Sequence, residues 1–168
     1  MTWQAWEEKL RGRMLDLRLL PINDDALQQA EELWTLPPLA QADRPPVFDW
    51  RKIYQQVRAS PRRFDMAIWN GSLLCGLMVG KAFRGKMNQH VDSNVTIRFL
   101  QSAPPAVNVL RGNIALIAIE AAENYATVLG KRYVYVKSPL HEVMTLYTGL
   151  GFRVANRQAK GLYMVREV

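Results

Sequence analysis

The stretch from Arg111 to Leu116 combines residue types that can bind an anion. It lies where a loop leads into a long helical pattern that starts near Ile114. The first N–H groups of a helix have no acceptor within the helix, and together with the helix dipole they attract negative charge. Arg111 adds a cation, and Asn113 can cap the helix or adopt an unusual φ. We therefore predict a phosphate-binding site here, the alternative being an ordinary capped helix without a ligand.

The charge distribution favours the same region. Of the net charge of +7, residues 61–111 carry +5, from seven basic and two acidic residues. A positive field there attracts a phosphorylated small molecule, and it would equally attract RNA. The third interpretation is a basic surface that serves solubility alone.

The helix that begins near Ile114 carries an apolar stripe on one face. Glu120, Glu123 and Asn124 are expected on its outer side, and Gly130 is typical of a helix end. The stripe is made of Ile114, Ile117, Ala118, Ala121, Ala122, Tyr125, Val128 and Leu129.

The rest of the chain alternates strands and helices. Asn23, Asp24 or Asp25 can cap one helix and Asp49 another, and Asn70-Gly71 is a strong hairpin signal. Gly76 and Gly80 permit the close approach of another backbone. Pro139 suits the first turn of the last helix, which Gly149 and Gly151 end. The expected strands are Leu15–Ile22, Phe64–Trp69, Ser72–Phe83, Val95–Leu100, Tyr133–Val136, Arg153–Asn156 and Leu162–Val165, and the expected helices before residue 60 are Thr2–Met14, Ala26–Leu36 and Trp50–Arg58, with a loop at Pro37–Pro46.

Two motifs resemble the GCN5-related N-acetyltransferase (GNAT) family. Leu146-Tyr147 followed by Gly151-Phe152 is similar to that family's late-helix motif, and Leu129-Gly130 before a valine-rich strand is similar to the end of its pyrophosphate-binding helix. The family's phosphate motif falls on Leu110–Ala115. There Ala115 matches the motif, whereas Leu110 and Asn113 do not. Arg111 and Gly112 each lie one position away from the place where the motif has that residue type. The resemblance covers roughly residues 95–168.

The resemblance implies an α/β fold with a mixed, mostly antiparallel central sheet flanked by helices, as a single-layer sandwich. We expect one domain over residues 1–168, with residues 1–14 as an N-terminal helical extension. That extension packs on the domain or forms a homodimer or partner contact.

The resemblance also implies an N-acetyltransferase that uses acetyl-CoA to acetylate a primary amine by direct transfer. Because the chain has one cysteine and only two histidines, His90 and His141, we expect no metal site. Tyr147 would assist the departing thiolate, although it can instead be a core tyrosine. The strand before the phosphate loop would bind the pantetheine arm and stabilise the oxyanion. The cofactor-binding residues implied are Leu100, Gln101, Ser102, Arg111, Gly112, Asn113, Ile114, Ala115 and Leu116.

The sequence identifies no general base. Glu120 and Glu123 are predicted on the outer face of their helix, His90 and Asp92 lie in a basic turn, and His141 is expected to be exposed. Two alternatives therefore stay open. One is a catalytically decayed GNAT-fold binding or regulatory module, and the other is a toxin-like enzyme that acetylates aminoacyl-tRNA.

Composition limits the remaining classes. The single cysteine, Cys75, excludes an internal disulfide and suits a reducing compartment, and we expect it to be a buried strand residue. No stretch of about 18 apolar residues is present, and charges interrupt the first residues, so we expect neither a membrane span nor a signal peptide. The expected setting is cytoplasmic, with a small-molecule or protein amine as the substrate.

Overall fold

The computed structural model describes residues 16–35, 47–83, 93–105, 108–155 and 161–168. The predicted helix Thr2–Met14, the loop Pro37–Pro46 and the basic turn with His90 and Asp92 lie outside the described residues. The chain divides into two compact units. The first unit draws on Met1–Ala59, Asp65–Leu77 and Leu100–Ala115, and the second on Ser60–Phe64, Met78–Phe99 and Leu116–Val168. A single domain over residues 1–168 stays a prediction.

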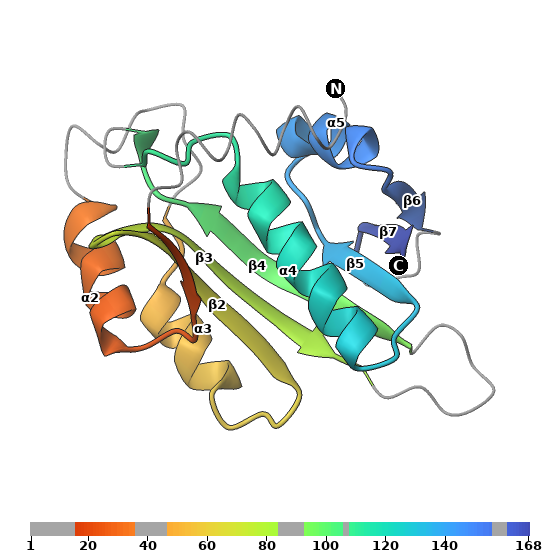
Figure 1. Ribbon diagram of the computed structural model, residues 1–168, viewed down its shortest axis with the longest axis horizontal. Coiled ribbons are helices and arrows are strands. Elements are labelled where there is room, and N and C mark those ends of the chain that lie inside the picture. Colours follow the sequence, from red (N-terminus) through yellow and green to blue (C-terminus); the bar gives the residue numbers. More distant parts are fainter. Residues whose placement is uncertain (1–15, 36–46, 84–92, 106–107, 156–160) are drawn as a thin grey trace. The chain divides into compact units, whose positions relative to one another are not determined.

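The described strands form a seven-stranded sheet in the order β1-β2-β3-β4-β5-β7-β6. β1 pairs with β2, β5 with β7 and β6 with β7 in antiparallel fashion, whereas β4 and β5 run parallel. This arrangement confirms the predicted α/β class with a mostly antiparallel sheet. The elements, labelled in Figure 1, are β1 Leu17–Leu20, α2 Asp24–Leu33, α3 Trp50–Val57, β2 Arg63–Asn70, β3 Leu73–Ala82, β4 Asn94–Ser102, α4 Ile114–Val128, β5 Tyr133–Lys137, α5 His141–Gly149, β6 Arg153–Ala155 and β7 Tyr163–Glu167.

Side-chain caps start α2 and α3 of the first unit where the sequence predicts them. Asn23 Oδ1 accepts a hydrogen bond of 2.9 Å from the Ala26 N–H at the start of α2. Asp49 Oδ1 accepts one of 2.9 Å from the Lys52 N–H at the start of α3. Each cap satisfies an N–H group that the helix itself leaves without an acceptor.

Two predicted helix boundaries were wrong. α2 ends at Leu33 rather than Leu36, because the helical conformation is disfavoured for a residue that precedes proline and the helix stops before that point. Pro139 does not lie in the first turn of α5. The helix begins at His141, and Leu140 holds the extended N-cap position (φ −60°, ψ 144°), which places the proline one residue before the cap.

The predicted hairpin joins β2 to β3, but its turn lies one residue later than expected. Gly71 (φ 61°) and Ser72 form the turn, whereas Asn70 stays in β2 and pairs with Leu17 of β1. The pairing with β1 extends β2 through Asn70. A glycine with positive φ then occupies the first turn position, as tight hairpins require.

Both glycines of β3 lie where no Cβ fits, for two different reasons. A Cβ on Gly80 would lie 2.8 Å from the carbonyl oxygen of Thr96, so the predicted close backbone approach is confirmed there. A Cβ on Gly76 would lie 2.7 Å from Cγ2 of Ile114. The prediction was wrong for Gly76, because the group that approaches it is a side chain from the first turn of α4 and not a backbone.

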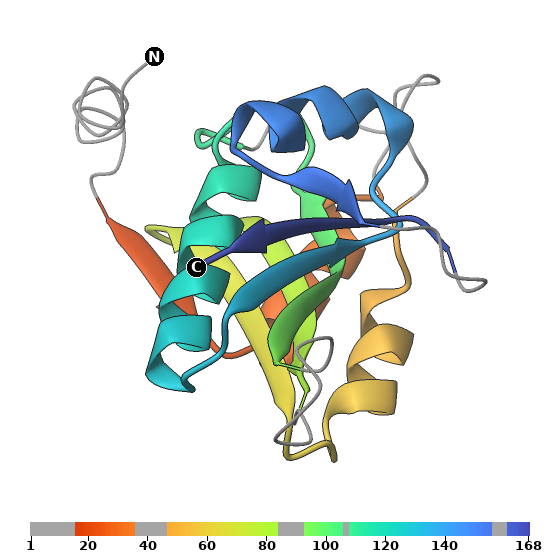
Figure 2. The same ribbon diagram turned by 90° about the vertical axis from the view of Figure 1, so that its right-hand side faces the viewer.

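In the second unit, α4 lies on one face of the sheet, and β6 and β7 follow beside β5 (Figure 2). Tyr125 of α4 stacks on Phe64, with ring centroids 4.5 Å apart. The predicted apolar stripe is buried through most of the helix. The prediction was wrong for its last two residues, because Val128 is 83% exposed and Leu129 is 42% exposed. Ala126 is fully buried instead, so the covered face ends one turn earlier than the apolar pattern.

A left-handed glycine ends α4, as predicted. Gly130 has φ 63° and its N–H donates to the Thr127 carbonyl at 3.0 Å. The Lys131 N–H donates to the Ala126 carbonyl at 2.8 Å. This pair of bonds is the Schellman motif, which satisfies the last carbonyls of a helix.

The same motif ends α5. Gly151 has φ 86°, and its N–H donates to the Thr148 carbonyl at 3.0 Å. The Phe152 N–H donates to the Tyr147 carbonyl at 3.0 Å, and the two rings pack edge to face at 5.8 Å. An apolar contact between these two positions often accompanies the motif. The spacing from Tyr147 to Gly151-Phe152 therefore has a structural function as a helix cap.

This cap can be tested with a matched pair of glycine substitutions. We expect Gly151→Ala to lower the free energy of unfolding by about 1–2 kcal/mol, because alanine is strained at positive φ. A methyl group there has room, since the nearest atoms to its position lie 3.9 Å away or more. Gly149→Ala is the control: that residue ends α5 with open space around it, and we expect no loss or a gain of up to about 1 kcal/mol. Equal effects in urea denaturation would contradict this account of the cap.

Candidate functional site

The loop between β4 and α4 is organised by the buried amide of Asn108. Its Nδ2 donates to Ser102 Oγ at 2.6 Å and to the Ala103 carbonyl at 3.4 Å, and its Oδ1 accepts from the Leu110 N–H at 2.9 Å. The Ala103 N–H in turn donates to the Cys75 carbonyl of β3 at 2.9 Å. One side chain thus joins the end of β4 to the turn before α4. Sequence reasoning missed Asn108, whose available signal was the tendency of Asn to bond the backbone two residues on.

Leu110 departs from the family's phosphate motif because it belongs to the core. Its side chain is fully buried. Its carbonyl accepts the Asn113 N–H at 2.9 Å, and the Arg111 N–H donates to the Asn108 carbonyl at 3.2 Å. Two amides of the predicted phosphate site are therefore engaged in tight turns within the loop.

Gly112 lies at the exposed tip of these turns. It has φ 83°, and apart from its two chain neighbours no residue has an atom within 4 Å of the position that its Cβ would occupy. Arg111 beside it is exposed, and Asn113 is half-buried.

The first turn of α4 is fixed by burial on one side and partly open on the other. Ile114 is 3% exposed and packs against Gly76 of β3. Ala115 is half-exposed, and Leu116 is buried. The N–H groups of these first three helical residues have no carbonyl one turn earlier in the helix to accept their hydrogen bonds. They are groups that an anion can use, so the residues present fit a bound diphosphate.

The end of β4 carries Leu100, Gln101 and Ser102, all half-buried. The parallel register with β5 runs from Asn94 to Ile97, and β4 continues past it. Ser102 is held by Asn108 as described above. The structure therefore brings the β4 group of predicted cofactor residues and the start of α4 together through one loop of the first unit.

Tyr147 belongs to the second unit. It is 4% exposed, and burial raises its pKa to about 12. The phenol is therefore protonated throughout the neutral range and can donate a hydrogen bond, but it cannot act as a base. In the α5 cap, the Tyr147 ring packs edge to face against Phe152.

The predicted outer-face position of Glu123 was wrong. Its side chain is 17% exposed, and Oε1 lies 3.1 Å from Nε of Arg166 on β7, although without hydrogen-bond geometry. Desolvation raises the pKa of Glu123, and Arg166 opposes that shift. Arg166 Nη1 also donates to the Leu150 carbonyl at 2.8 Å. The pair thus ties α4, β7 and the end of α5 together, which a helical-wheel pattern could not reveal because α4 is covered on two sides.

Two further candidate groups, His141 and Cys75, lie where the sequence analysis places them. His141 is exposed, as predicted. Cys75 is fully buried in β3, and burial raises the pKa of its thiol. Within the described ranges, no cluster of three His, Cys, Asp or Glu side chains could hold a metal ion. Nor does any helix in this part of the chain have the length and apolar character to cross a membrane.

Comparison with known proteins identifies the fold. No family model matches the sequence, and no curated protein matches it. An acetyltransferase from Thermus thermophilus aligns with a TM-score of 0.65 at 18% identity, over 92% of this chain and 99% of that chain. The PaiA N-acetyltransferase from Thermoplasma acidophilum, solved in complex with coenzyme A, aligns with a TM-score of 0.62 at 10% identity, over 92% of this chain and 100% of that chain. A GNAT-family acetyltransferase from Listeria monocytogenes aligns with a TM-score of 0.62 at 12% identity, over 90% of this chain and 95% of that chain. The chain therefore has the GNAT fold.

Proposed function

We propose that this protein is a GNAT-family N-acetyltransferase that transfers an acetyl group from acetyl-CoA directly to a primary amine. The observation that supports this proposal is the start of α4, where the first helical N–H groups have no acceptor within the helix and follow Gly112, whose Cβ position has no atom of a non-adjacent residue within 4 Å. Similarity to the coenzyme A complex of PaiA supports the choice of donor.

The diphosphate of the donor would be held by backbone N–H groups at Gly112 and at the first turn of α4. The amides of Arg111 and Asn113 are occupied by turn hydrogen bonds, so the binding falls to Gly112, Ile114, Ala115 and Leu116. The exposed Arg111 side chain adds a charge-assisted contact. The departures from the family motif leave this set of amides intact, because Leu110 faces the core and the Asn113 amide bonds within the loop.

The end of β4 would receive the pantetheine arm and the reacting carbonyl. Leu100, Gln101 and Ser102 follow the point where the register with β5 stops. A backbone N–H of this segment that donates to the developing oxyanion would lower the barrier by about 3 kcal/mol. Asn108 holds the segment in place through Ser102, which makes it a positioning residue.

Tyr147 would donate a hydrogen bond to the departing thiolate. With its pKa at about 12 and a free thiol near 8.5, complete proton transfer from the phenol is uphill by about 5 kcal/mol. A hydrogen bond in the transition state avoids that cost. The tyrosine therefore stabilises developing negative charge on sulfur without becoming a phenolate.

The overall reaction balances without a further reagent. Acetyl-CoA supplies an acetyl group activated as a thioester. The neutral amine nitrogen bonds to the acetyl carbon, the carbon–sulfur bond breaks, and the proton lost by the amine nitrogen is matched by the proton that the departing thiolate gains to become the thiol. No described residue is assigned as the base that deprotonates the amine.

The substitution Ala115→Glu tests the diphosphate site. We expect coenzyme A affinity to fall by about 10-fold or more, because the new carboxylate lies among amides meant for an anion. Folding should be preserved, since an acidic residue in the first turn of a helix is favourable. For wild type, coenzyme A at 100 times Kd should stabilise the native state by about 2.7 kcal/mol in thermal melts, and at the same concentration Ala115→Glu should keep at most about 1.4 kcal/mol of that stabilisation.

The control for this test is Asn124→Glu, which adds the same charge on an exposed position of α4 and should keep the response to coenzyme A. A well-folded Ala115→Glu variant that binds coenzyme A as tightly as wild type would place the diphosphate elsewhere. No response in wild type itself would favour the non-catalytic alternative.

The substitution Tyr147→Phe tests the leaving-group role. Phenylalanine keeps the ring packing in the α5 cap, so stability should change by less than about 1 kcal/mol. We expect kcat to fall by about 10- to 100-fold, with the KM for acetyl-CoA nearly unchanged, because the hydrogen bond forms in the transition state. Unchanged kcat in steady-state assays of thiol release would assign Tyr147 to the cap alone.

A further inference from the structure

Arg166 of β7 contacts the C-terminal end of α5 directly. Its Nη1 donates a hydrogen bond of 2.8 Å to the carbonyl of Leu150, the residue at the C-cap position of α5. The helix itself provides no donor for a carbonyl at this position. A hydrogen bond from a guanidinium is charge-assisted, and the helix dipole favours a cation at this end. Arg166 therefore fixes the end of α5 more firmly than a neutral donor would.

The residue that Arg166 holds is also bonded to the backbone of Tyr147. The Leu150 N–H donates to the carbonyls of Leu146 and Tyr147, each at 3.1 Å. The Tyr147 carbonyl also accepts from the Phe152 N–H at 3.0 Å. Through its N–H and its carbonyl, Leu150 thus connects Tyr147 with the Arg166 guanidinium.

The carboxylate of Glu123 holds the guanidinium from the side of α4. Glu123 Oε1 lies 3.1 Å from Arg166 Nε, and the Glu123 side chain is 17% exposed. Because this oxygen makes no hydrogen bond, the attraction is between the two charges, and the Nη1 hydrogen bond goes to Leu150 instead. Burial raises the pKa of Glu123, and the charge of Arg166 opposes that shift. Loss of Arg166 alone would leave a buried carboxylate without its counter-charge, which is costly.

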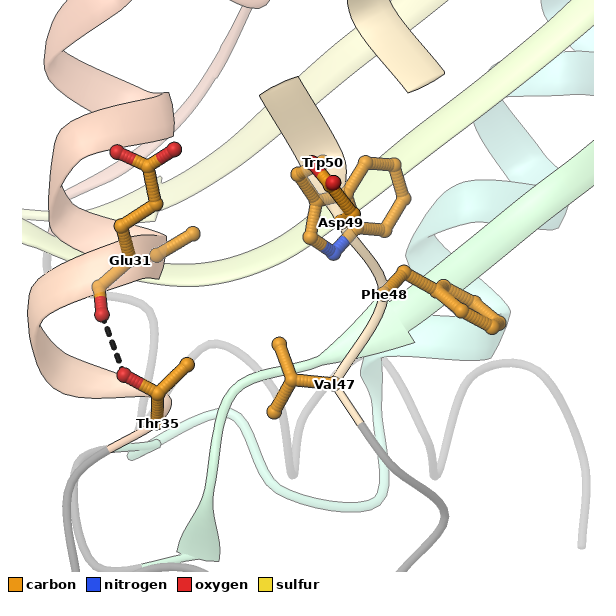
Figure 3. A pocket seen from close by; sticks show the side chains of 7 residues that line it. Glu31, Thr35, Val47, Phe48, Asp49 and Trp50 are labelled. Atoms are coloured by element: carbon orange, nitrogen blue, oxygen red, sulfur yellow. Dashed lines mark hydrogen bonds between the residues drawn. The ribbon is translucent and has the colours of Figure 1, made fainter. Parts of the chain in front are cut away.

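Two other arginine–glutamate pairs among the described residues are exposed. Arg51 Nε lies 2.8 Å from Glu31 Oε1, with side chains 41% and 48% exposed. Figure 3 shows Glu31 on α2, at a pocket of 320 Å³ that α2 forms with the segment before and at the start of α3. Arg132 and Glu167 lie 2.8 Å apart and are 54% and 60% exposed. Exposed pairs of this kind contribute little to stability, so the buried Glu123 distinguishes the pair at the end of α5.

We propose that Arg166 is a positioning residue for Tyr147 and that Glu123 in turn holds Arg166 in place. This inference rests on the proposed function, in which the Tyr147 hydroxyl donates to the departing thiolate. A misplacement of about 1 Å at a reacting group can cost about 100-fold in rate. Movement of the α5 end would displace the hydroxyl from the sulfur, although Arg166 itself touches no reacting atom.

The double substitution Glu123→Leu with Arg166→Met tests the proposal. Replacing both members of a buried ion pair by apolar residues of similar size preserves stability, so the melting temperature should stay within about 4 °C of wild type. Thiol release is measured with hydroxylamine as the acceptor, which is small and largely unprotonated at neutral pH. We expect kcat to fall by about 10-fold and the KM for acetyl-CoA to stay within about 2-fold, because cofactor binding does not involve the pair.

Two further variants support this measurement. Arg132→Met with Glu167→Leu is the control, because it makes the same changes in an exposed pair that also includes a β7 residue, and kcat should stay within about 2-fold. Arg166→Lys keeps the counter-charge of Glu123 and hence the fold. It offers one nitrogen where arginine uses two, so kcat should still fall by about 3-fold or more.

The same double substitution in a Tyr147→Phe background separates positioning from a general structural effect. Without the hydroxyl there is nothing to position, so kcat should change by less than about 2-fold. Equal losses in both backgrounds would overturn the inference and leave the pair a purely structural role. Unchanged kcat in the Glu123→Leu/Arg166→Met variant, or in Tyr147→Phe itself, would overturn it as well.

A second readout does not depend on turnover. In protein labelled with ¹³C-tyrosine, the Tyr147 ring signal is the one that Tyr147→Phe removes. Coenzyme A should shift this signal in wild type and in the Arg132/Glu167 control, but not in the Glu123/Arg166 double variant. No shift in wild type, or the same shift in the double variant, would contradict the positioning role. An Arg166-dependent shift without any thiol release would uphold that role and overturn the proposed acetyl transfer.

Discussion

The candidate site depends on the packing of Ile114, in the first turn of α4, against Gly76 of β3. Any Cβ at Gly76 would collide with Ile114, so the bare backbone of β3 determines how closely the first turn of α4 can approach the sheet. That turn carries the amides to which we assign the diphosphate. Leu110, buried just before it, holds the preceding loop against the core. Hydrophobic contacts thereby fix the position of this turn against the sheet.

Hydrogen bonds of two side-chain amides hold the segments on either side of this packing contact. The side-chain amide of Asn108 connects the last residues of β4 with the turn at Leu110, and both its nitrogen and its oxygen make hydrogen bonds. Because this amide is buried, leaving either atom without a partner would lower the stability of the fold. A comparable role belongs to Gln101, whose side chain accepts from two groups at the start of α3. The end of β4, the loop before α4 and the start of α3 are thus joined by two neutral amides, whose hydrogen bonds do not depend on pH.

Much of the fold could be predicted because its signals are local. The caps at Asn23 and Asp49 and the glycine end of α4 follow from residues within one turn of each other. Errors arose where distant contacts decide. Glu123 looked solvent-facing along its own helix, but Arg166, more than forty residues later, pairs with it. The candidate site was harder to predict than the fold. Asn108 belongs to no periodic pattern, and Leu110 departs from the family motif because it is a core residue.

The late motif around Tyr147 shows how a family pattern can carry two meanings. Its spacing builds the cap of α5, so the pattern alone does not separate a catalytic tyrosine from a structural one. The central claim therefore concerns the amides at the start of α4. Titrating coenzyme A into ¹⁵N-labelled protein and following backbone amide shifts tests it directly. The account predicts the largest shifts at Gly112, Ile114 and Ala115; large shifts confined to other segments, or none at saturating coenzyme A, would contradict it.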